Sequence, residues 1–255
     1  MKNSKPPSDR AQSLYKGLQI LQCFGDGTPA MTLTEVADAV FMNKATARRF
    51  LLTLLDMGYL TQHDRYFRLT TKVMTLGYNY LSSLPWWDMA QPIANEVATK
   101  LSESCSISMI SNETLVFVAR VQGSRALTLN TKPGRQVPTW CTSVGRVLMA
   151  EIDEKILGKI FQKNPPIKLT PQTLTDFGDI VLQLRKIKSQ GYAIVDQELE
   201  VGLVGVAVPV KDKSNEIVAA IGVSAHAQHF SEERLCQEIL PTLSKAAADL
   251  GQFMT

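Results

Sequence analysis

Residues 32–57 read TLTEVADAVFMNKATARRFLLTLLDM, a sequence that predicts two helices separated by a short turn. Thr32 and Glu35 form the Ser/Thr-x-x-Glu pattern of a capping box, which marks the start of a helix. Asn43 is a favoured N-cap for a second helix over residues 44–57, and Gly58 is the residue type that commonly follows a helix end. This arrangement is typical of a helix-turn-helix motif.

The flanking segments extend this motif to a winged helix-turn-helix over residues 1–70. Upstream, Leu14, Leu18 and Leu21 recur at helical spacing and predict a third helix. Downstream, residues 58–62 and 65–69 alternate like two short strands around a polar tip, which predicts a β-hairpin. A hairpin directly after a helix-turn-helix is the wing of such a domain.

The outward face of the second helix carries the chemistry of DNA recognition. Arg and Lys pair with phosphates and guanine edges, and Thr and Ala contact thymine methyl groups. The residues expected to contact DNA are Lys44, Ala45, Thr46, Arg48 and Arg49 on the helix and Arg65 and Arg68 on the wing. Residues 1–80 hold ten Lys/Arg and six Asp/Glu, net +4, whereas the rest of the chain is net −1. The alternative is a three-helix packing module with a solvated basic face.

Beyond residue 70 the chain predicts a helical linker and a second domain. Residues 71–87 are apolar on one side and are not rich in Gly or Ser, so a stiff connector is expected. Residues 88–255 alternate between strand-like and helix-like segments. The strand-like segments are 105–110, 115–121, 127–131, 192–195, 204–210 and 217–223. Strands interrupted by helices in this way predict an α+β domain with a mostly antiparallel sheet.

Composition restricts the class of protein further. The chain has 255 residues, of which 45% are hydrophobic and 20% charged, so it is globular and long enough for two domains. No apolar run approaches the ~20 residues of a membrane helix, and no apolar segment of a secretory signal follows the basic N-terminus. The cysteines are scattered without a CxxC pair, which argues against a disulfide framework and favours a reducing cytoplasm.

The order and spacing of several motifs resemble the IclR-type bacterial transcriptional regulators over nearly the whole chain. In the first domain the motifs are Leu33-Thr34-Glu35-Val36-Ala37, Thr46-Ala47-Arg48-Arg49-Phe50-Leu51 and Gly58-Tyr59-Leu60. In the second they are Pro133-Gly134, Cys141-Thr142-Ser143-Val144-Gly145-Arg146, Asp196-Gln197-Glu198 with Gly202, and Val208-Pro209-Val210. Leu76-Gly77-Tyr78, Ser83-Leu84-Pro85-Trp86 and Ala47-Arg48-Arg49 are similar to the subgroup that regulates protocatechuate, 4-hydroxybenzoate and β-ketoadipate catabolism. The resemblance implies a ligand-responsive transcription factor whose effector domain has a GAF/profilin-like fold.

The helix-turn-helix departs from this family at two positions. The family usually has Gly in the turn where this chain has Phe41, and often Pro where it has Asn43. A positive φ is costly for a bulky residue. We therefore expect the turn to take another shape here, which would change the angle of the recognition helix.

The start of the predicted helix 143–150 is a candidate anion site. Free N–H groups and the helix dipole attract carboxylates at such a position, and Thr142 and Ser143 add hydroxyls; plain N-capping is the alternative. The resemblance implies that this helix start, the segment 196–206 and Ser224 line an effector pocket. The expected effector-binding residues are Cys141, Thr142, Ser143, Asp196, Gly202, Val204, Gly205, Val206 and Ser224. Many relatives have Cys or Ser in place of Gly205 and Arg in place of Val204, so a wider and less polar wall is expected.

An enzyme is the rival interpretation, with Cys141 as its nucleophile. A thiol near a helix start can have a lowered pKa. His226, His229 and Cys236 could form a metal-ligand cluster, but the His-x2-His spacing is a weak signal, and polar residues of a loop are the favoured explanation. The chain has no P-loop, and no GxGxxG follows a predicted strand, so neither catalysis nor a cofactor is expected.

The expected partners are operator DNA, a small carboxylate and further copies of the chain. The carboxylate would be an aromatic acid or a dicarboxylate, from aromatic or hydroaromatic catabolism. At least a dimer is expected, formed partly through the segment 72–87, because a lone winged helix contacts only one half-site. A structural DNA-binding protein without a ligand is a further alternative. The expected assembly is a homodimer or a tetramer.

Overall fold

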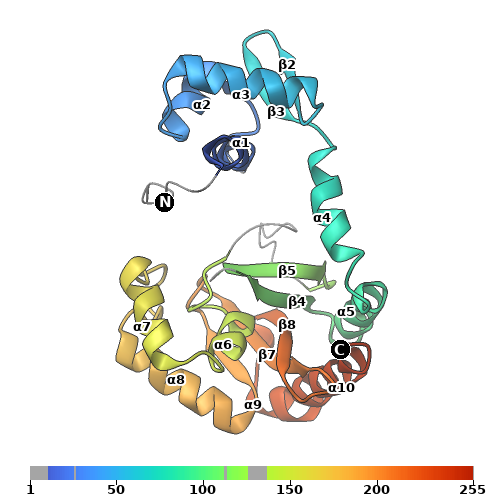
Figure 1. The fold of residues 1–255 in the computed structure, drawn as a ribbon. Helices are drawn as coiled ribbons and strands as arrows, with labels where there is room; N and C mark the ends of the chain where they lie inside the picture. The colour runs from blue at the N-terminus through green and yellow to red at the C-terminus, as the bar shows by residue number, and fades with distance from the viewer. Residues whose placement is uncertain (1–10, 26, 112–113, 126–136, 255) are drawn as a thin grey trace. The chain divides into compact units, whose positions relative to one another are not determined.

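The computed structural model describes residues 11–25, 27–111, 114–125 and 137–254, which form two compact units. The units comprise Met1–Ser83 and Leu84–Thr255 (Figure 1). The fold class predicted from the sequence, a winged helix-turn-helix followed by an α+β domain, is confirmed. None of the helices in the described ranges is long and apolar enough to span a bilayer.

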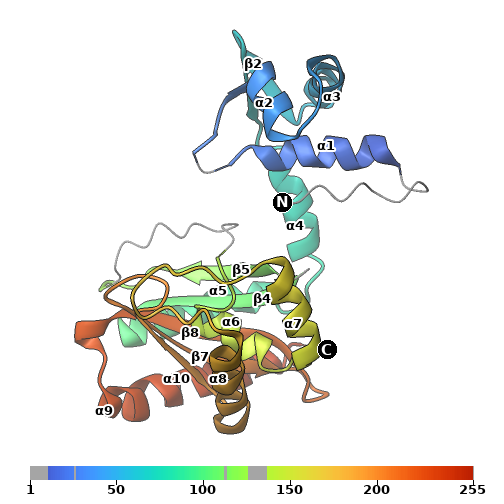
Figure 2. The same cartoon turned by 90° about the vertical axis from the view of Figure 1, so that its left-hand side faces the viewer.

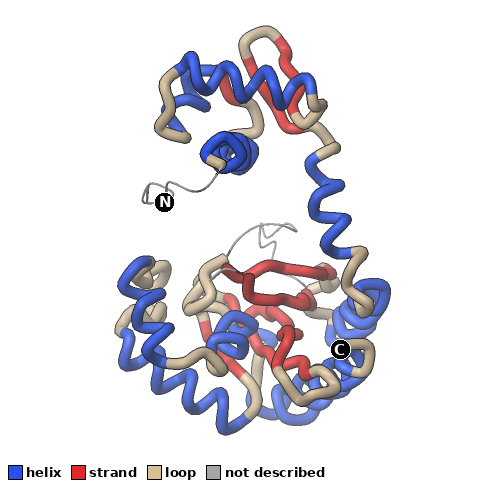
Figure 3. Tube along the Cα trace, viewed as in Figure 1, coloured by secondary structure: helices blue, strands red, loops and turns tan. Residues whose placement is uncertain are grey.

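The first unit has a three-helix core and a small antiparallel sheet (Figure 3). The strand order of this sheet is β1-β3-β2. Its elements are α1 (Gln12–Cys23), β1 (Met31–Thr32), α2 (Leu33–Ala39), α3 (Lys44–Asp56), β2 (Leu60–His63), β3 (Tyr66–Leu69) and α4 (Val73–Leu81). The core unites Ile20, Val36, Leu51, Leu54 and Phe67 from these helices and from β3. The two helices and the hairpin predicted from residues 32–69 are therefore present.

Local hydrogen bonds explain why α2 and α3 begin where they do. The Glu35 carboxylate accepts from the Thr32 N–H at 2.7 Å, and the Thr32 hydroxyl accepts from the Glu35 N–H at 3.3 Å, which completes the capping box. The Asn43 side chain accepts from the Thr46 N–H at 2.8 Å. These bonds satisfy N–H groups that the first turn of a helix leaves free.

The turn between α2 and α3 differs from the expected shape. Phe41 has a φ of 52°, so the chain keeps the left-handed conformation that usually needs Gly. The Phe41 N–H donates to the Asp38 carbonyl at 3.2 Å and the Met42 N–H to the Ala37 carbonyl at 2.9 Å. These two bonds are the Schellman pattern that ends a helix, and they require a left-handed residue at position 41. The expectation that Phe41 would force another turn was wrong.

The second unit has a five-stranded antiparallel sheet of order β5-β4-β8-β7-β6 (Figure 2). Its elements up to β6 are α5 (Trp87–Leu101), β4 (Ser104–Ser111), β5 (Thr114–Val121), α6 (Ser143–Met149), α7 (Glu154–Lys163), α8 (Phe177–Gln190) and β6 (Ala193–Asp196). The remaining elements are β7 (Leu203–Lys211), β8 (Ile217–His226), the 3-10 turn Ala227–His229, α9 (Glu232–Arg234), the π-helical turn Leu235–Ile239 and α10 (Leu240–Gly251). The predicted strand at 127–131 lies outside the described residues.

Helices cover both faces of this sheet. Helix α6 packs across β6, β7, β8 and β4 on one face, and α8 packs behind α6. Helices α5 and α10 pack on the other face, against β4 and β5 and against β7 and β8. Because side chains of a strand alternate between the faces, each strand supplies both cores. The α6 face also holds the pocket described below.

The segment expected to be a linker is divided between the two units. Helix α4 has no buried residue and belongs to the first unit, where Met74, Leu76, Tyr78 and Tyr80 are exposed. Trp86, which lies in the segment 72–87 expected to form part of a dimer contact, is buried in the second unit.

Candidate effector pocket and nucleic-acid interface

The pocket rests on one face of the five-stranded sheet, where the strand register aligns small and polar residues. Gly205 of β7 pairs with Ser224 of β8, and Gly222 of β8 pairs with Ser106 of β4. Ser106 in turn pairs with Arg120 of β5. Directly paired residues of antiparallel strands point to the same side, so the five positions share one face. The empty space between these residues is about 500 Å³, a figure that counts open solvent at the mouth of the pocket.

Two glycines of this floor let the start of α6 approach the sheet closely. A Cβ on Gly205 would lie 2.8 Å from Ser143 Oγ, and one on Gly222 would lie 2.9 Å from Val144 Cγ1. At either distance the neighbouring side chain of α6 would have to move. The expectation of a wider wall at Gly205 therefore needs revision, because Ser143 occupies the space that a side chain there would fill.

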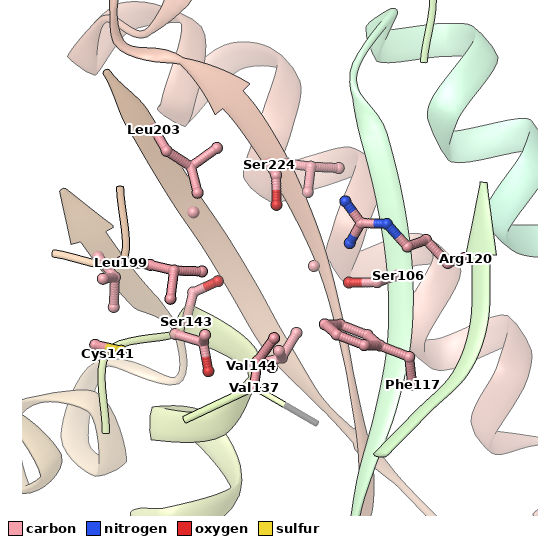
Figure 4. Close-up of a pocket in the computed structure, with 15 residues that line it drawn as sticks. Ser106, Phe117, Arg120, Val137, Cys141, Ser143, Val144, Leu199, Leu203 and Ser224 are labelled. Carbon is pink, nitrogen blue, oxygen red and sulfur yellow. The ribbon is translucent and has the colours of Figure 1, made fainter. Parts of the chain in front are cut away.

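The two hydroxyls at the start of α6 have different roles. Thr142 Oγ1 accepts from the Gly145 N–H at 3.2 Å and donates to the Pro138 carbonyl at 3.2 Å, so it serves as the helix N-cap. Among the described residues, Ser143 Oγ has no hydrogen-bond partner, and it faces the pocket in Figure 4. Plain N-capping thus accounts for Thr142, and Ser143 stays available to a ligand.

The opposite side of the pocket holds a guanidinium group. Arg120 is half-buried on β5, and its Cζ lies 5.4 Å from the ring centroid of Phe117. Burial lowers the pKa of Arg120, but an arginine stays protonated at neutral pH. Within the described part of the chain this cation has no ion pair or hydrogen bond. Figure 4 shows it on the same side as Ser106 and Ser224, away from Ser143 and Cys141.

The predicted effector residues divide into two groups in the structure. Those that line the pocket are Cys141, Thr142, Ser143, Gly205 and Ser224. Those that do not are Asp196, Gly202, Val204 and Val206. Val204 and Val206 alternate with Gly205 along β7, so their side chains point to the opposite face. Asp196 is exposed at the end of β6, and Gly202 lies beside the His226 ring.

Sequence reasoning missed the β4 and β5 side of the pocket. Ser106, Phe117 and Arg120 line it, and none of the motifs drew attention to them. Two signals were present. Residues 104–108 read SCSIS, with a serine at every second position, and Arg120 interrupts an otherwise apolar strand.

Cys141 lines the pocket but lacks the properties of a nucleophile. Burial is the main cause that raises the pKa of its thiol to about 12, with a smaller contribution from Glu198. The thiol therefore stays neutral at physiological pH, whereas the thiolate is the reactive form. The helix start does not lower its pKa as the sequence suggested.

The histidines do not form a metal centre in the described residues. His226 Nδ1 accepts from the Gln228 N–H at 3.1 Å, and the rings of His226 and His229 lie 6.1 Å apart. No group of three or more His, Cys, Asp or Glu side chains gathers within the residues that the structure describes.

The nucleic-acid interface predicted on the first unit is exposed. Lys44, Ala45, Arg48 and Arg49 are exposed on α3 and Thr46 is half-buried, while Ala47, Leu51 and Leu54 of the same helix are buried. On the wing, Arg68 is exposed, and Arg65 Cζ lies 5.3 Å from the Tyr66 ring centroid. The basic side chains of α3 thus point away from the core.

Two domain families match the chain. The IclR helix-turn-helix domain matches residues 13–64, and the family described as bacterial transcriptional regulator IclR, C-terminal, matches residues 78–252. The Pca regulon regulatory protein of Pseudomonas putida is 33% identical over 95% of this chain and 84% of its own length. The p-hydroxybenzoate hydroxylase transcriptional activator of Acinetobacter baylyi is 30% identical over 96% of this chain and 93% of its own.

Solved structures agree with these matches. A transcriptional-regulator structure from Rhodococcus sp. RHA1 has a TM-score of 0.83 and 37% identity, covering 96% of this chain and 98% of that one. The inducer-binding domain of PobR from Acinetobacter, a double mutant in complex with 3-hydroxybenzoic acid, has a TM-score of 0.61 and 26% identity, covering 66% of this chain and 98% of that one. The predicted likeness to the protocatechuate and 4-hydroxybenzoate regulators is confirmed. The chain belongs to the IclR family of ligand-responsive, DNA-binding transcriptional regulators.

Proposed function

We propose that this protein regulates an operon for aromatic or hydroaromatic acid catabolism and that an aromatic carboxylate switches its DNA activity. The observation that carries the proposal is the half-buried guanidinium of Arg120, which has no counter-charge among the described residues. A charge removed from water is costly unless it is paired. A ligand carboxylate would supply that pair, and the names of two relatives refer to p-hydroxybenzoate hydroxylase and to bound 3-hydroxybenzoic acid.

The pocket suggests one orientation for such a ligand. The carboxylate would accept two parallel N–H bonds from Arg120, with the hydroxyls of Ser106 and Ser224 on the same side. Hydrogen bonds to a charged group contribute about 1.5–3 kcal/mol each. The aromatic ring would lie near Phe117, and Ser143 would bind a hydroxyl at the far end. This proposal replaces the expected carboxylate site at the start of α6, because the Thr142 hydroxyl is already bonded within the cap.

Thermal unfolding with candidate acids tests this site. A ligand at 100 times its Kd should stabilise the unit that binds it by about 2.7 kcal/mol. We expect 3- or 4-hydroxybenzoate to stabilise the wild type more than succinate does, and Arg120→Met to abolish the effect. Arg125→Met is the matched control, because Arg125 is exposed and does not line the pocket. Full stabilisation of Arg120→Met by the aromatic acids, or stabilisation of the wild type by succinate alone, would contradict the proposal.

The enzyme alternative has less support. Every relative named above is a regulator, and the Cys141 thiol is neutral at physiological pH. Substrate turnover that is lost in Cys141→Ala would favour the enzyme.

On the DNA side, we infer contacts from α3 and the wing to operator DNA in the cytoplasm. Lys44, Ala45, Thr46, Arg48 and Arg49 would enter the major groove, while Arg65 and Arg68 would contact neighbouring phosphates. We infer a homodimer or tetramer, because α4 leaves a row of apolar side chains exposed.

A further inference from the structure

Two helices of the first unit end in the same backbone motif with different residues. Helix α3 ends at Gly58, which has a φ of 74°, where the Gly58 N–H donates to the Leu55 carbonyl at 2.8 Å and the Tyr59 N–H to the Leu54 carbonyl at 2.9 Å. Helix α2 ends with the same pair of bonds around Phe41, at a φ of 52°. Both positions need a left-handed residue, and the chain uses Gly at only one of these two.

The Phe41 side chain does not stabilise the fold, although the positive φ of this residue is strained. Its side chain is 79% exposed, more than any other large apolar side chain described in the structure. Among the described residues its ring forms no aromatic pair and no contact with a cation, whereas Met42 next to it packs against the core. A strained residue that persists without packing indicates a function outside the folded chain.

The position of Phe41 indicates what it contacts. It lies in the turn before α3 (Figure 1), two residues before the N-cap Asn43 and three before the exposed Lys44. The N-terminal residues of a recognition helix contact base edges, so the preceding turn lies at the edge of the major groove. The apolar groups available there are thymine methyls and deoxyribose carbons, and Phe contacts the thymine methyl in known complexes.

We propose that Phe41 contacts the operator, with its ring packed against the apolar edge of the major groove. The inference rests on the proposed DNA-binding function. It assigns to the turn a contact that a glycine at this position could not make. This contact explains why a left-handed position carries an aromatic side chain that is largely exposed.

Three variants of the full chain separate this role from a structural one. The probe is the DNA duplex that the wild type selects from a random pool, with the Kd measured at fixed salt. Phe41→Gly should raise the melting temperature of the first unit, because Gly relieves the strain, while weakening binding of the duplex about tenfold. Phe41→Tyr should keep the affinity. Met57→Ala should change neither, because Met57 is an exposed apolar residue at the other end of α3 with an ordinary φ of −73°.

Several outcomes would overturn the inference. The Phe41→Gly variant could bind the duplex within twofold of the wild type, or it could melt at a lower temperature than the wild type. It could also change the self-association of the chain in the absence of DNA. A wild type that selects no duplex would overturn the proposed DNA-binding function, and this inference with it. Duplexes with deoxyuridine in place of thymidine identify the contact: a selective loss for the wild type assigns the thymine methyl, and no loss assigns the deoxyribose.

Discussion

Arg146 and Glu198 form a buried ion pair that connects the two walls of the pocket. Arg146 is 2% exposed, and its Nη1 and Nη2 lie 2.6 and 2.7 Å from Glu198 Oε1 and Oε2. Arg146 Nε donates to the Trp140 carbonyl at 2.7 Å, and the Leu174 N–H donates to Glu198 Oε2 at 2.9 Å. The pair therefore holds α6 against the segment that contains Leu199, which also lines the pocket.

At this residue scale we predict that Glu198→Gln destabilises the second unit by about 3–5 kcal/mol, because it leaves a buried guanidinium without its counter-charge. Urea unfolding followed by tryptophan fluorescence reports on this unit alone, since Trp86, Trp87 and Trp140 all lie in it. Glu154→Gln is the control: it breaks the exposed pair with Arg185 and should change the urea midpoint little. Similar, small shifts for both variants would contradict this account.

At the scale of elements, α3 and the wing should contribute differently to DNA binding. Replacing both Arg48 and Arg49 by Ala should weaken operator binding by about 1–3 kcal/mol for each base that these arginines recognise, and it should relax the preference at those base pairs. Arg68→Ala should weaken all sequences alike and reduce the salt slope by about one, as expected for a phosphate contact. Arg185→Ala removes the same charge from an exposed site of the second unit and should leave both properties unchanged. Unchanged operator affinity in the double variant would contradict the assignment to α3.

At the scale of the whole molecule, the exposed apolar side chains of the first unit predict self-association. Leu14 of α1 and Met74, Tyr78 and Tyr80 of α4 are all more than half exposed. We expect at least a dimer at micromolar concentration, because pairing covers this surface and lets two winged helices bind half-sites about 34 Å apart. Analytical ultracentrifugation measures this directly, and Tyr78→Glu should shift the population toward monomer. A wild-type monomer both with and without operator DNA would contradict the prediction.

The helices and the hairpin of the first unit, and the family of the chain, could be predicted from the sequence alone. Thr32 with Glu35, Asn43 and Gly58 specify helix ends through bonds between neighbours, so their spacing was sufficient. The order of strands and helices likewise predicted the α+β class of the second unit, because hydrophobic periodicity follows secondary structure. These properties depend on residues only a few positions apart.

The lining of the pocket and the turn at Phe41 depend on how the elements pack together, which the sequence did not reveal. Arg120 and Ser143 line the same cavity because α6 packs on the sheet that contains β5, and the strand register turns Val204 and Val206 away from it. At position 41 the rule that bulky residues avoid positive φ failed, because the Schellman hydrogen bonds and the packing of Met42 hold the turn. Side chains far apart in sequence acquire neighbours only when the sheet and helices assemble, and that assembly also overrides local conformational preference.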